Sequence, residues 1–298
     1  FVREQNSETI FAFRFDENNY SAWYGLSSMF ATIDDTGWGE MYVSDKYIQH
    51  IQKFPQDVRN EFIHPDYKLT DGAKLPTVYW TEFNNANKYY EYKIYKANVD
   101  ATGKHVSFEK DGVTYPIKEE TFNYGGPEYT KFYADINGTK QYLTKEYEMQ
   151  NRNGYPKYFM YKNSLQEGKD HLYSPIISRL AEIHLIRAEV YAKQGKTAEA
   201  LAEVNMIRRR AGAPEFATLP TGKNALDIVL EERWLELAYE GHRKFDLVRN
   251  KQTVDRRIPG VHLSQTKTKQ FVEPTDDDLV FFIPEAELNR NPNMIQNP

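Results

Sequence analysis

The sequence contains no cysteine among its 298 residues. Disulfides, thiolate metal sites and thiol nucleophiles are therefore excluded together. Basic residues are also outnumbered, with 38 Lys and Arg against 43 Asp and Glu, which gives a formal net charge of -5. A chain without a positive excess lacks the electric field that recruits phosphate backbones, so we expect no nucleic-acid partner.

Long apolar runs are missing as well. No stretch approaches the roughly 18 to 20 apolar residues that cross a bilayer. The sequence starts at Phe1 without a charged and then apolar leader before it. A signal for export or lipidation would have been lost with a preceding segment, so we expect membrane contact only through a lipid anchor on a missing N-terminal segment.

Aromatic residues divide the chain into two parts. Of the 22 tyrosines, 20 precede Ser174, as do three of the four tryptophans. We therefore expect a loop-rich, aromatic, ligand-facing lobe with short strands over residues 1–174 and a helical scaffold over residues 175–298. Within the first part, Asp111-Gly112 lies between two β-prone runs and predicts a hairpin over residues 105–117. Stretches rich in Gly and Pro indicate loops elsewhere in this part.

Helical spacing begins at Leu180. One stripe of apolar residues has the three-and-four spacing of a helix: Leu180, Ile183, Ile186 and Val190. A second stripe follows Gly195, so the sequence predicts a helical hairpin over residues 179–212. Its small and aromatic positions resemble one tetratricopeptide unit, which needs helical neighbours because it cannot bury its outer face alone.

A longer apolar stripe predicts one helix over residues 224–250, followed by a C-terminal tail over residues 276–298. Gly241 lies inside this stripe. Glycine within a helix costs about 0.5 to 1 kcal/mol relative to alanine, so we expect another backbone to approach closely there.

Ionisable residues crowd the same predicted helix. Glu232, Glu236 and Glu240 are successive i, i+4 neighbours, and each like-charged pair costs about 0.2 to 0.5 kcal/mol on an exposed helix. One interpretation makes two of these carboxylates a catalytic acid and base. The other makes them buried partners of arginines. We favour the second, because the charges recur with helical spacing and no second catalytic constellation is visible, and we therefore expect neither catalytic residues nor enzyme activity.

Three motifs after Arg179 carry a resemblance to a known family. In chain order they are "RLAEIHLIRAEVYAKQGKTAEALAEVNMIRRRAG", then E-R-x-x-E-L-x-x-E-G-x-R-x-x-D-L-x-R within "IVLEERWLELAYEGHRKFDLVR", and finally "FFIPEAELNRNPNMIQNP". They strongly resemble the C-terminal half of SusD/RagB-type proteins, the outer-membrane nutrient-binding lipoproteins of Bacteroidetes. The segments "NSETIFAFRF" and "PQDVRNEF" resemble earlier family segments.

This resemblance implies a mainly α fold, a tetratricopeptide-type α–α superhelix with a loop-rich lobe that contains short strands and a hairpin. It implies non-catalytic binding of an oligosaccharide or polysaccharide at the cell surface, with delivery to a SusC-like, TonB-dependent outer-membrane transporter. Two alternatives stay open: peptide capture, as in RagB, and glycoside hydrolysis. Relatives are typically much longer and carry an N-terminal lipidated cysteine, so this chain resembles a C-terminal portion.

Exposed aromatic rings are the expected ligand-binding groups, because a flat apolar ring with a polar tip suits a sugar. We select the rings in or beside turn-rich stretches: Trp23, Tyr24, Trp38, Tyr42, Tyr79 and Trp80. The alternative is that these rings fill the core, as large aromatic residues most often do. No histidine spacing typical of zinc occurs, and the acidic residues 16–19 and 275–279 fit solvated turns better than calcium loops. We expect neither a metal nor a cofactor.

Overall fold

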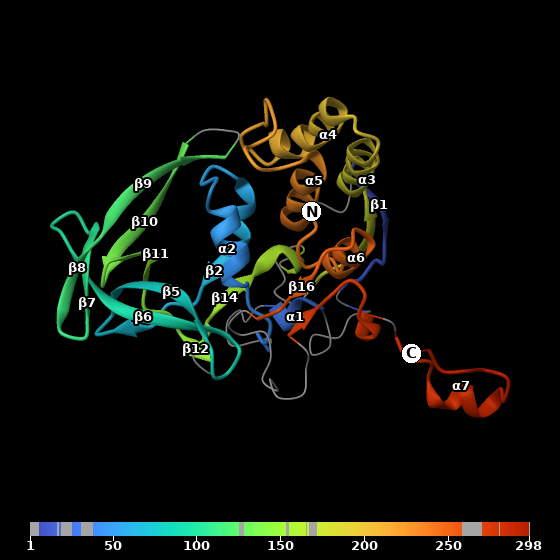
Figure 1. Cartoon of the computed structure of the whole chain (residues 1–298), viewed down its shortest axis with the longest axis horizontal. Coiled ribbons are helices and arrows are strands. Elements are labelled where there is room, and N and C mark those ends of the chain that lie inside the picture. The colour runs from blue at the N-terminus through green and yellow to red at the C-terminus, as the bar shows by residue number, and fades with distance from the viewer. Residues whose placement is uncertain are drawn as a thin grey trace.

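The computed structural model of the chain (Figure 1) describes residues 6–16, 18, 26–30, 38–124, 128–152, 155–164, 166, 172–257, 270–279 and 281–297. Helices make up 30% of the structure and strands make up 32%. The expected mainly α fold is therefore wrong, because the aromatic part of the chain forms a large antiparallel sheet in place of loops with short strands.

The helical elements lie mostly in the second half of the chain. They are α1 (Leu26–Phe30), α2 (Asp45–Ile51), η1 (Val58–Phe62), η2 (Tyr161–Asn163), α3 (Leu180–Lys193), α4 (Thr197–Arg210), α5 (Ala225–Glu236), α6 (Arg243–Arg249), η4 (Asp277–Leu279) and α7 (Glu285–Arg290).

Seven consecutive strands form the main sheet, in the spatial order β8-β7-β6-β5-β11-β10-β9. They are β5 (Pro76–Asn84), β6 (Tyr89–Val99), β7 (His105–Lys110), β8 (Val113–Pro116), β9 (Lys118–Asn123), β10 (Glu128–Ile136) and β11 (Thr139–Tyr147). The sheet curls in Figure 1, with β9 and β10 standing opposite α2.

The remaining strands form short pairs. They are β1 (Thr9–Ala12) with β15 (Ile176–Arg179), β2 (Ile63–Pro65) with β14 (Tyr158–Met160), β3 (Leu69–Thr70) with β4 (Ala73–Lys74), β12 (Asn151–Arg152) with β13 (Tyr155–Pro156), and β16 (Val254–Asp255) with β17 (Phe271–Val272).

The aromatic part forms a sheet because β-prone residues run over strand lengths between tight turns. Asp111 and Gly112 have φ angles of 52° and 77° and join β7 to β8, which confirms the hairpin predicted over residues 105–117. Asn137 and Gly138, with φ angles of 50° and 80°, join β10 to β11 in the same way. Such turns require positive φ at both central residues, which Asn, Asp and Gly tolerate best. Several Gly- and Asn-containing stretches therefore connect paired strands.

Alternation along the strands gives the sheet two packed faces. Val78 and Trp80 of β5 point into a core cluster that also contains Phe108, Ala134 and Leu143. Tyr79, between them in the sequence, belongs to a different cluster. The sheet is therefore anchored on both faces.

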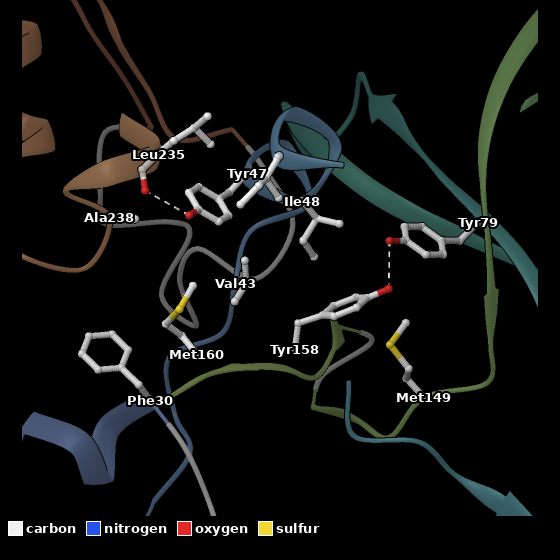
Figure 2. Close-up of a cluster of buried hydrophobic side chains, with 11 residues drawn as sticks. Phe30, Val43, Tyr47, Ile48, Tyr79, Met149, Tyr158, Met160, Leu235 and Ala238 are labelled. Atoms are coloured by element: carbon white, nitrogen blue, oxygen red, sulfur yellow. Dashed lines mark hydrogen bonds between the residues drawn. The ribbon is translucent and has the colours of Figure 1, made fainter. Parts of the chain in front are cut away.

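The second cluster joins the sheet to α2 and α5 (Figure 2). The Tyr47 hydroxyl of α2 donates a hydrogen bond of 3.3 Å to the Leu235 carbonyl oxygen at the end of α5. The hydroxyl groups of Tyr79 and Tyr158 are 3.1 Å apart and hydrogen bonded. These contacts fix the position of α2 between the sheet and the helical part of the chain.

Helices α3 and α4 form the predicted hairpin over residues 179–212, and α5 contacts both of them. The predicted stripe on α3 is nevertheless not the buried one, because Leu180, Ile183, Ile186 and Val190 are between 37% and 47% exposed. The buried face contains Ala181, Leu185 and Ala188, which also recur at helical spacing. Small residues let neighbouring helices approach closely, so the alanines face the bundle.

The single helix expected over residues 224–250 is also wrong, because two helices occupy this range. Helix α5 begins with a capping box between Asn224 and Asp227 and ends at Glu236, and a turn over residues 237–242 precedes α6. Gly241 has a φ of 82°, and no described atom lies within 4 Å of where its Cβ would be. The close approach expected at Gly241 is therefore absent, and the glycine allows a left-handed turn.

Three expectations stay predictions: the domain boundary between residues 174 and 175, the assignment of the helical hairpin to a tetratricopeptide unit, and the C-terminal tail over residues 276–298 as a unit. Within the tail, α7 lies apart from the other helices in Figure 1 and has no buried residue. Among the described residues, no helix combines the length and the apolar character that a membrane span requires.

Candidate functional site

Buried ion pairs surround α5. The Arg59 guanidinium lies 2.8 Å from Glu232 and 3.2 Å from Glu236, and Arg208 lies 2.9 Å from the other oxygen of Glu232. Glu232 and Arg208 are each only 1% exposed. Because an unpaired buried charge is costly, these contacts hold α5 against α4 and against η1.

Arg179 and Lys162 extend the same network. Arg179 lies 2.5 Å from Glu236 and 2.8 Å from Glu240, and the Lys162 ammonium also contacts Glu240. Burial opposes ionisation of Glu236, but the guanidinium groups of Arg179 and Arg59 hold its pKa at about 2. We call this set of residues around Glu232, Glu236 and Glu240 the buried network.

The buried network confirms the architectural interpretation of the three glutamates. Each carboxylate has an arginine within ion-pair distance. A catalytic acid and base need pKa values that are pushed apart within a cleft that admits substrate. The strongly lowered pKa of Glu236 fits a permanently ionised partner of arginines instead.

A groove of about 1050 Å³ lies between α2 and the β5-β11-β10 portion of the sheet, with α5 and the start of α6 at its side. Helix α2 contributes its face at spacing i, i+3 and i+4, namely Lys46, Gln49 and His50, and Lys53 follows one turn later. This spacing places the first three side chains on one side of α2, and Lys53 lies in the turn that follows the helix. The groove brings side chains of helix and sheet together.

Alternation supplies the opposite wall. Tyr129 and Lys131 of β10 share one face of the sheet with Tyr142 and Thr144 of β11, and all four line the groove. Tyr79 pairs with Thr144 in the register of β5 and β11, so this wall continues directly into the core beneath α2. A rigid sheet therefore presents these side chains.

Three rings form a continuous surface on that wall, which we call the aromatic platform. The Phe122 ring stacks on Tyr129 with centroids 5.7 Å apart and meets Tyr142 edge-on at 6.1 Å. Tyr142 is 38% exposed, and its hydroxyl donates a 2.8 Å hydrogen bond to Glu120. The platform thus combines exposed ring surface with polar groups at its rim.

Lysines stand on both walls of the groove. The Lys131 ammonium lies over the aromatic platform, 5.0 Å from the Phe122 centroid and 5.1 Å from that of Tyr142. Across the groove, the Lys53 ammonium lies 4.3 Å from the Tyr124 centroid and 3.3 Å from His50 Nδ1. Burial lowers the pKa of Lys53; the carboxylate of Glu231 raises it in part, and the charge of Lys131 lowers it again.

His50 is neutral in this setting. Burial and the adjacent Lys53 lower its pKa to about 3, so its Nδ1 can accept the hydrogen bond from Lys53. The indole centroid of Trp234 lies 5.3 Å from the ring centroid of His50 and 5.0 Å from the guanidinium carbon of Arg243. The floor of the groove is therefore aromatic and fixed.

The carboxylate of Glu231 lies at the side of the groove and already accepts hydrogen bonds. It accepts a 2.7 Å hydrogen bond from Lys223 and another from the Tyr124 hydroxyl. Burial and this bond raise the pKa of Tyr124 well above its usual range. Glu231 consequently orients Tyr124 and Lys223 at the groove.

The six rings selected from the sequence are scattered. Trp23 and Tyr24 lie outside the described residues. Trp38 is 47% exposed, and Tyr42 is half-buried with its ring centroid 6.1 Å from that of Phe159. A role of these four residues in ligand binding stays a prediction.

Tyr79 and Trp80 are 1% and 2% exposed and belong to the two core clusters of the sheet. Trp80 stacks on Tyr95 at 4.9 Å and donates a 2.7 Å hydrogen bond to Glu82. Both residues line the base of the groove. Both rings are therefore packed in the core, which was the alternative to ligand binding. Contact of either ring with a ligand stays a prediction.

Sequence reasoning did not select the platform or the two lysines. A signal for the platform was present in "EYTKFYADI", where Tyr129, Lys131 and Tyr133 alternate with residues of the opposite face. The i, i+3, i+4 and i+7 spacing from Lys46 to Lys53 was a second signal. Neither pattern shows that these two segments face one another, which only the fold reveals.

Comparison with known proteins supplies the family. The sequence profile of the SusD family matches residues 7–298. The SusD-like protein P38 of Formosa agariphila is 36% identical over 100 residues, which are 31% of this chain and 20% of that protein. A SusD superfamily protein from Bacteroides thetaiotaomicron has a TM-score of 0.56 at 20% identity, covering 98% of this chain and 49% of its own. Another, from Parabacteroides distasonis, has a TM-score of 0.50 at 18% identity, covering 97% and 49%.

The two solved structures show a shared fold, and this chain spans about half of their length. The profile match extends over almost the whole chain, including the N-terminal part before Arg179. It confirms the resemblance that the three C-terminal motifs carry. On this evidence the chain belongs to the SusD family.

Proposed function

We propose that this protein binds an oligosaccharide or polysaccharide at the cell surface without cleaving it. The protein then delivers the glycan to a SusC-like, TonB-dependent transporter of the outer membrane. Family membership supports this role, since the family resembled by the C-terminal motifs captures nutrients at that surface. A lipid anchor on a preceding segment would hold the protein to the outer membrane.

The observation that carries the proposal is the aromatic platform in the wall of the groove. Sugar rings have an apolar face and a rim of hydroxyl groups, which an aromatic surface with polar groups beside it can match. Phe122, Tyr129 and Tyr142 provide the rings, and Glu120 and Lys131 stand at their edges.

The surroundings of the acidic residues favour binding over hydrolysis. A glycoside hydrolase needs two carboxyl groups about 5 to 9.5 Å apart across the sugar, one of them with a raised pKa. In the buried network the carboxylates are paired with arginines, and Glu231 beside the groove already accepts two hydrogen bonds.

Calorimetry with a panel of soluble polysaccharides and peptides tests the proposal. We expect saturable heat with at least one polysaccharide, lost when Tyr129 and Tyr142 are both changed to Ala. Saturable heat with peptides alone would overturn glycan binding in favour of the RagB-like alternative.

Chromatography of a bound glycan after prolonged incubation tests the absence of catalysis. We expect the chain length of the glycan to stay constant. Shorter products that disappear when one Glu or Asp is substituted would make the protein a hydrolase.

Co-purification from outer membranes tests the transporter partner. Full-length protein tagged at its C-terminus is expected to retain a TonB-dependent transporter after detergent extraction. Its recovery without any such transporter would contradict delivery.

A further inference from the structure

We infer that the groove between α2 and β10 recognises a negatively charged glycan, whose carboxylate or sulfate group lies between Lys53 and Lys131 while a sugar ring stacks on the aromatic platform. The inference rests on the proposed function and specifies the class of its ligand. It concerns residues outside the sequence motifs that identify the family.

The charge balance of the groove is opposite to that of the chain. The chain has a net charge of -5, yet the groove is lined by five cationic side chains and two carboxylates. The cations are Lys46, Lys53, Lys131, Lys145 and Arg243, and the carboxylates are Glu128 and Glu231. The ammonium of Lys145 lies over Phe132 on the opposite face of the sheet, so the other four cations supply the charge inside the groove. A concave surface with low-dielectric walls concentrates such a field, so an anion is attracted to this part of an otherwise acidic molecule.

The two central lysines form no ion pair with a described carboxylate, although each has an acidic neighbour: Glu231 acts on Lys53, and Glu120 is the cross-strand partner of Lys131. Lys53 contacts the neutral His50 and the ring of Tyr124, and the Lys131 ammonium lies over the rings of Phe122 and Tyr142. No described carboxylate lies within ion-pair distance of either ammonium group. By contrast, the sheet lysines Lys118 and Lys140 are 2.5 Å and 2.9 Å from carboxylates.

Burial of the Lys53 ammonium group has an energetic consequence. Partial burial lowers the pKa of Lys53; Glu231 offsets part of this effect, and the charge of Lys131 adds to it, so two like charges share the groove. An anion placed between them would remove this repulsion and accept charge-assisted hydrogen bonds from both lysines. The sugar bearing that anion would then lie against the rings beneath Lys131.

A neutral glycan fits the groove less well. It would stack on the platform but would leave both ammonium groups desolvated without compensation. The geometry therefore favours a charged polymer over its neutral counterpart. Carboxylates of uronic acids and sulfate esters share the required chemistry.

Affinity electrophoresis with matched polymers tests the inference and separates the two sources of charge. Polygalacturonate is compared with fully methyl-esterified polygalacturonate, and carrageenan with the same carrageenan after desulfation. We expect at least one charged polymer to bind about tenfold or more tightly than its neutral counterpart, in line with a charge-assisted hydrogen bond. The pair that shows the difference identifies carboxylate or sulfate as the anion.

Variants place the effect in the groove. Lys131→Gln and, separately, Lys53→Gln are expected to weaken binding of the charged polymer about tenfold while leaving the melting temperature unchanged. Lys68→Gln is the matched control, because Lys68 is 49% exposed, pairs with Glu148 and does not line the groove. The Lys68→Gln variant is expected to bind the charged polymer with the same affinity as the unmodified protein.

The outcomes separate the two proposals. Equal affinity for charged and neutral polymers, or equal behaviour of the groove variants and Lys68→Gln, would overturn the inference and leave glycan binding intact. Binding to none of the four polymers and to no other glycan of the panel would overturn the proposed function and the inference with it.

Discussion

The buried network and the groove are built from the same kinds of charged side chain in opposite surroundings. Around α5, Arg59 and Arg179 are buried and each contacts at least two carboxylates. In the groove, Lys53 and Lys131 contact rings and a neutral histidine. Charges that form ion pairs with one another hold the fold, whereas the groove lysines form no ion pair with a described carboxylate and are available to a ligand. The difference shows that the partners of an ionisable residue, and not its presence, indicate its role.

Breaking the network should have the largest effect. Arg179→Met leaves Glu236 and Glu240 with fewer partners in a buried site, and we expect a loss of about 3 to 5 kcal/mol of unfolding free energy. Urea denaturation measures this loss. Arg209→Met is the matched control, because Arg209 pairs with Glu215 at the surface, and it should cost less than about 1 kcal/mol. Equal effects of the two substitutions would contradict a structural role for burial.

The contribution of the buried network to the free energy of unfolding should decrease at acidic pH and be complete at neutral pH. The folded-state pKa of Glu236 is about 2 against an ordinary value of 4.5. Because the folded pKa is the lower one, its stabilisation is complete above about pH 4.5 and is lost as the pH falls toward 2. Glu236 alone would account for about 3 kcal/mol of this loss, at about 1.4 kcal/mol per pKa unit.

Urea denaturation at pH 7, 5 and 3 checks this dependence. We expect similar stability at pH 7 and pH 5 and a clear decrease at pH 3. A constant stability down to pH 3 would mean that the carboxylates of the network are not held ionised by their arginines.

Removing a platform ring should affect binding and spare the fold. Tyr129→Ala is expected to weaken glycan affinity by about 1 to 1.5 kcal/mol, roughly tenfold, because a stacking surface is lost. Tyr133→Ala is the control on the same face of β10, since Tyr133 does not line the groove. Calorimetry with the bound glycan compares them, and a larger effect of the control would move the binding site elsewhere on the sheet.

The smallest expected effect concerns the turn between α5 and α6. Gly241→Ala should cost about 1 kcal/mol, because an L-residue is strained at a φ of 82°. Gly241→Asn should cost less, since asparagine tolerates this conformation better. Thermal unfolding distinguishes this account from close packing, under which the larger Asn side chain would cost more than Ala.

The sequence predicted the helical hairpin and the role of the three glutamates, because helical spacing and local charge patterns decide both. The buried face predicted for α3 was wrong, because two sets of residues on this helix have the same helical spacing. Leu180 and Ile183 form a helical stripe, but so do Ala181 and Leu185, and hydrophobicity alone favoured the larger side chains. Close packing of α3 against α4 and α5 selected the smaller ones.

The large sheet could have been found in part. Asn137-Gly138 lies between two alternating runs and has the same turn chemistry as Asp111-Gly112, which did predict a hairpin. The groove could not have been found from spacing. Lys53 and Lys131 are far apart in the chain, and only the packing of α2 against the curled sheet brings their walls together.

A crystal structure with a bound oligosaccharide tests the division of roles most directly. The account predicts that the sugar occupies the groove, with one ring against Tyr129 or Tyr142 and an acidic group between Lys53 and Lys131. A sugar bound to Glu232 or Glu236, with their arginines displaced, would contradict it.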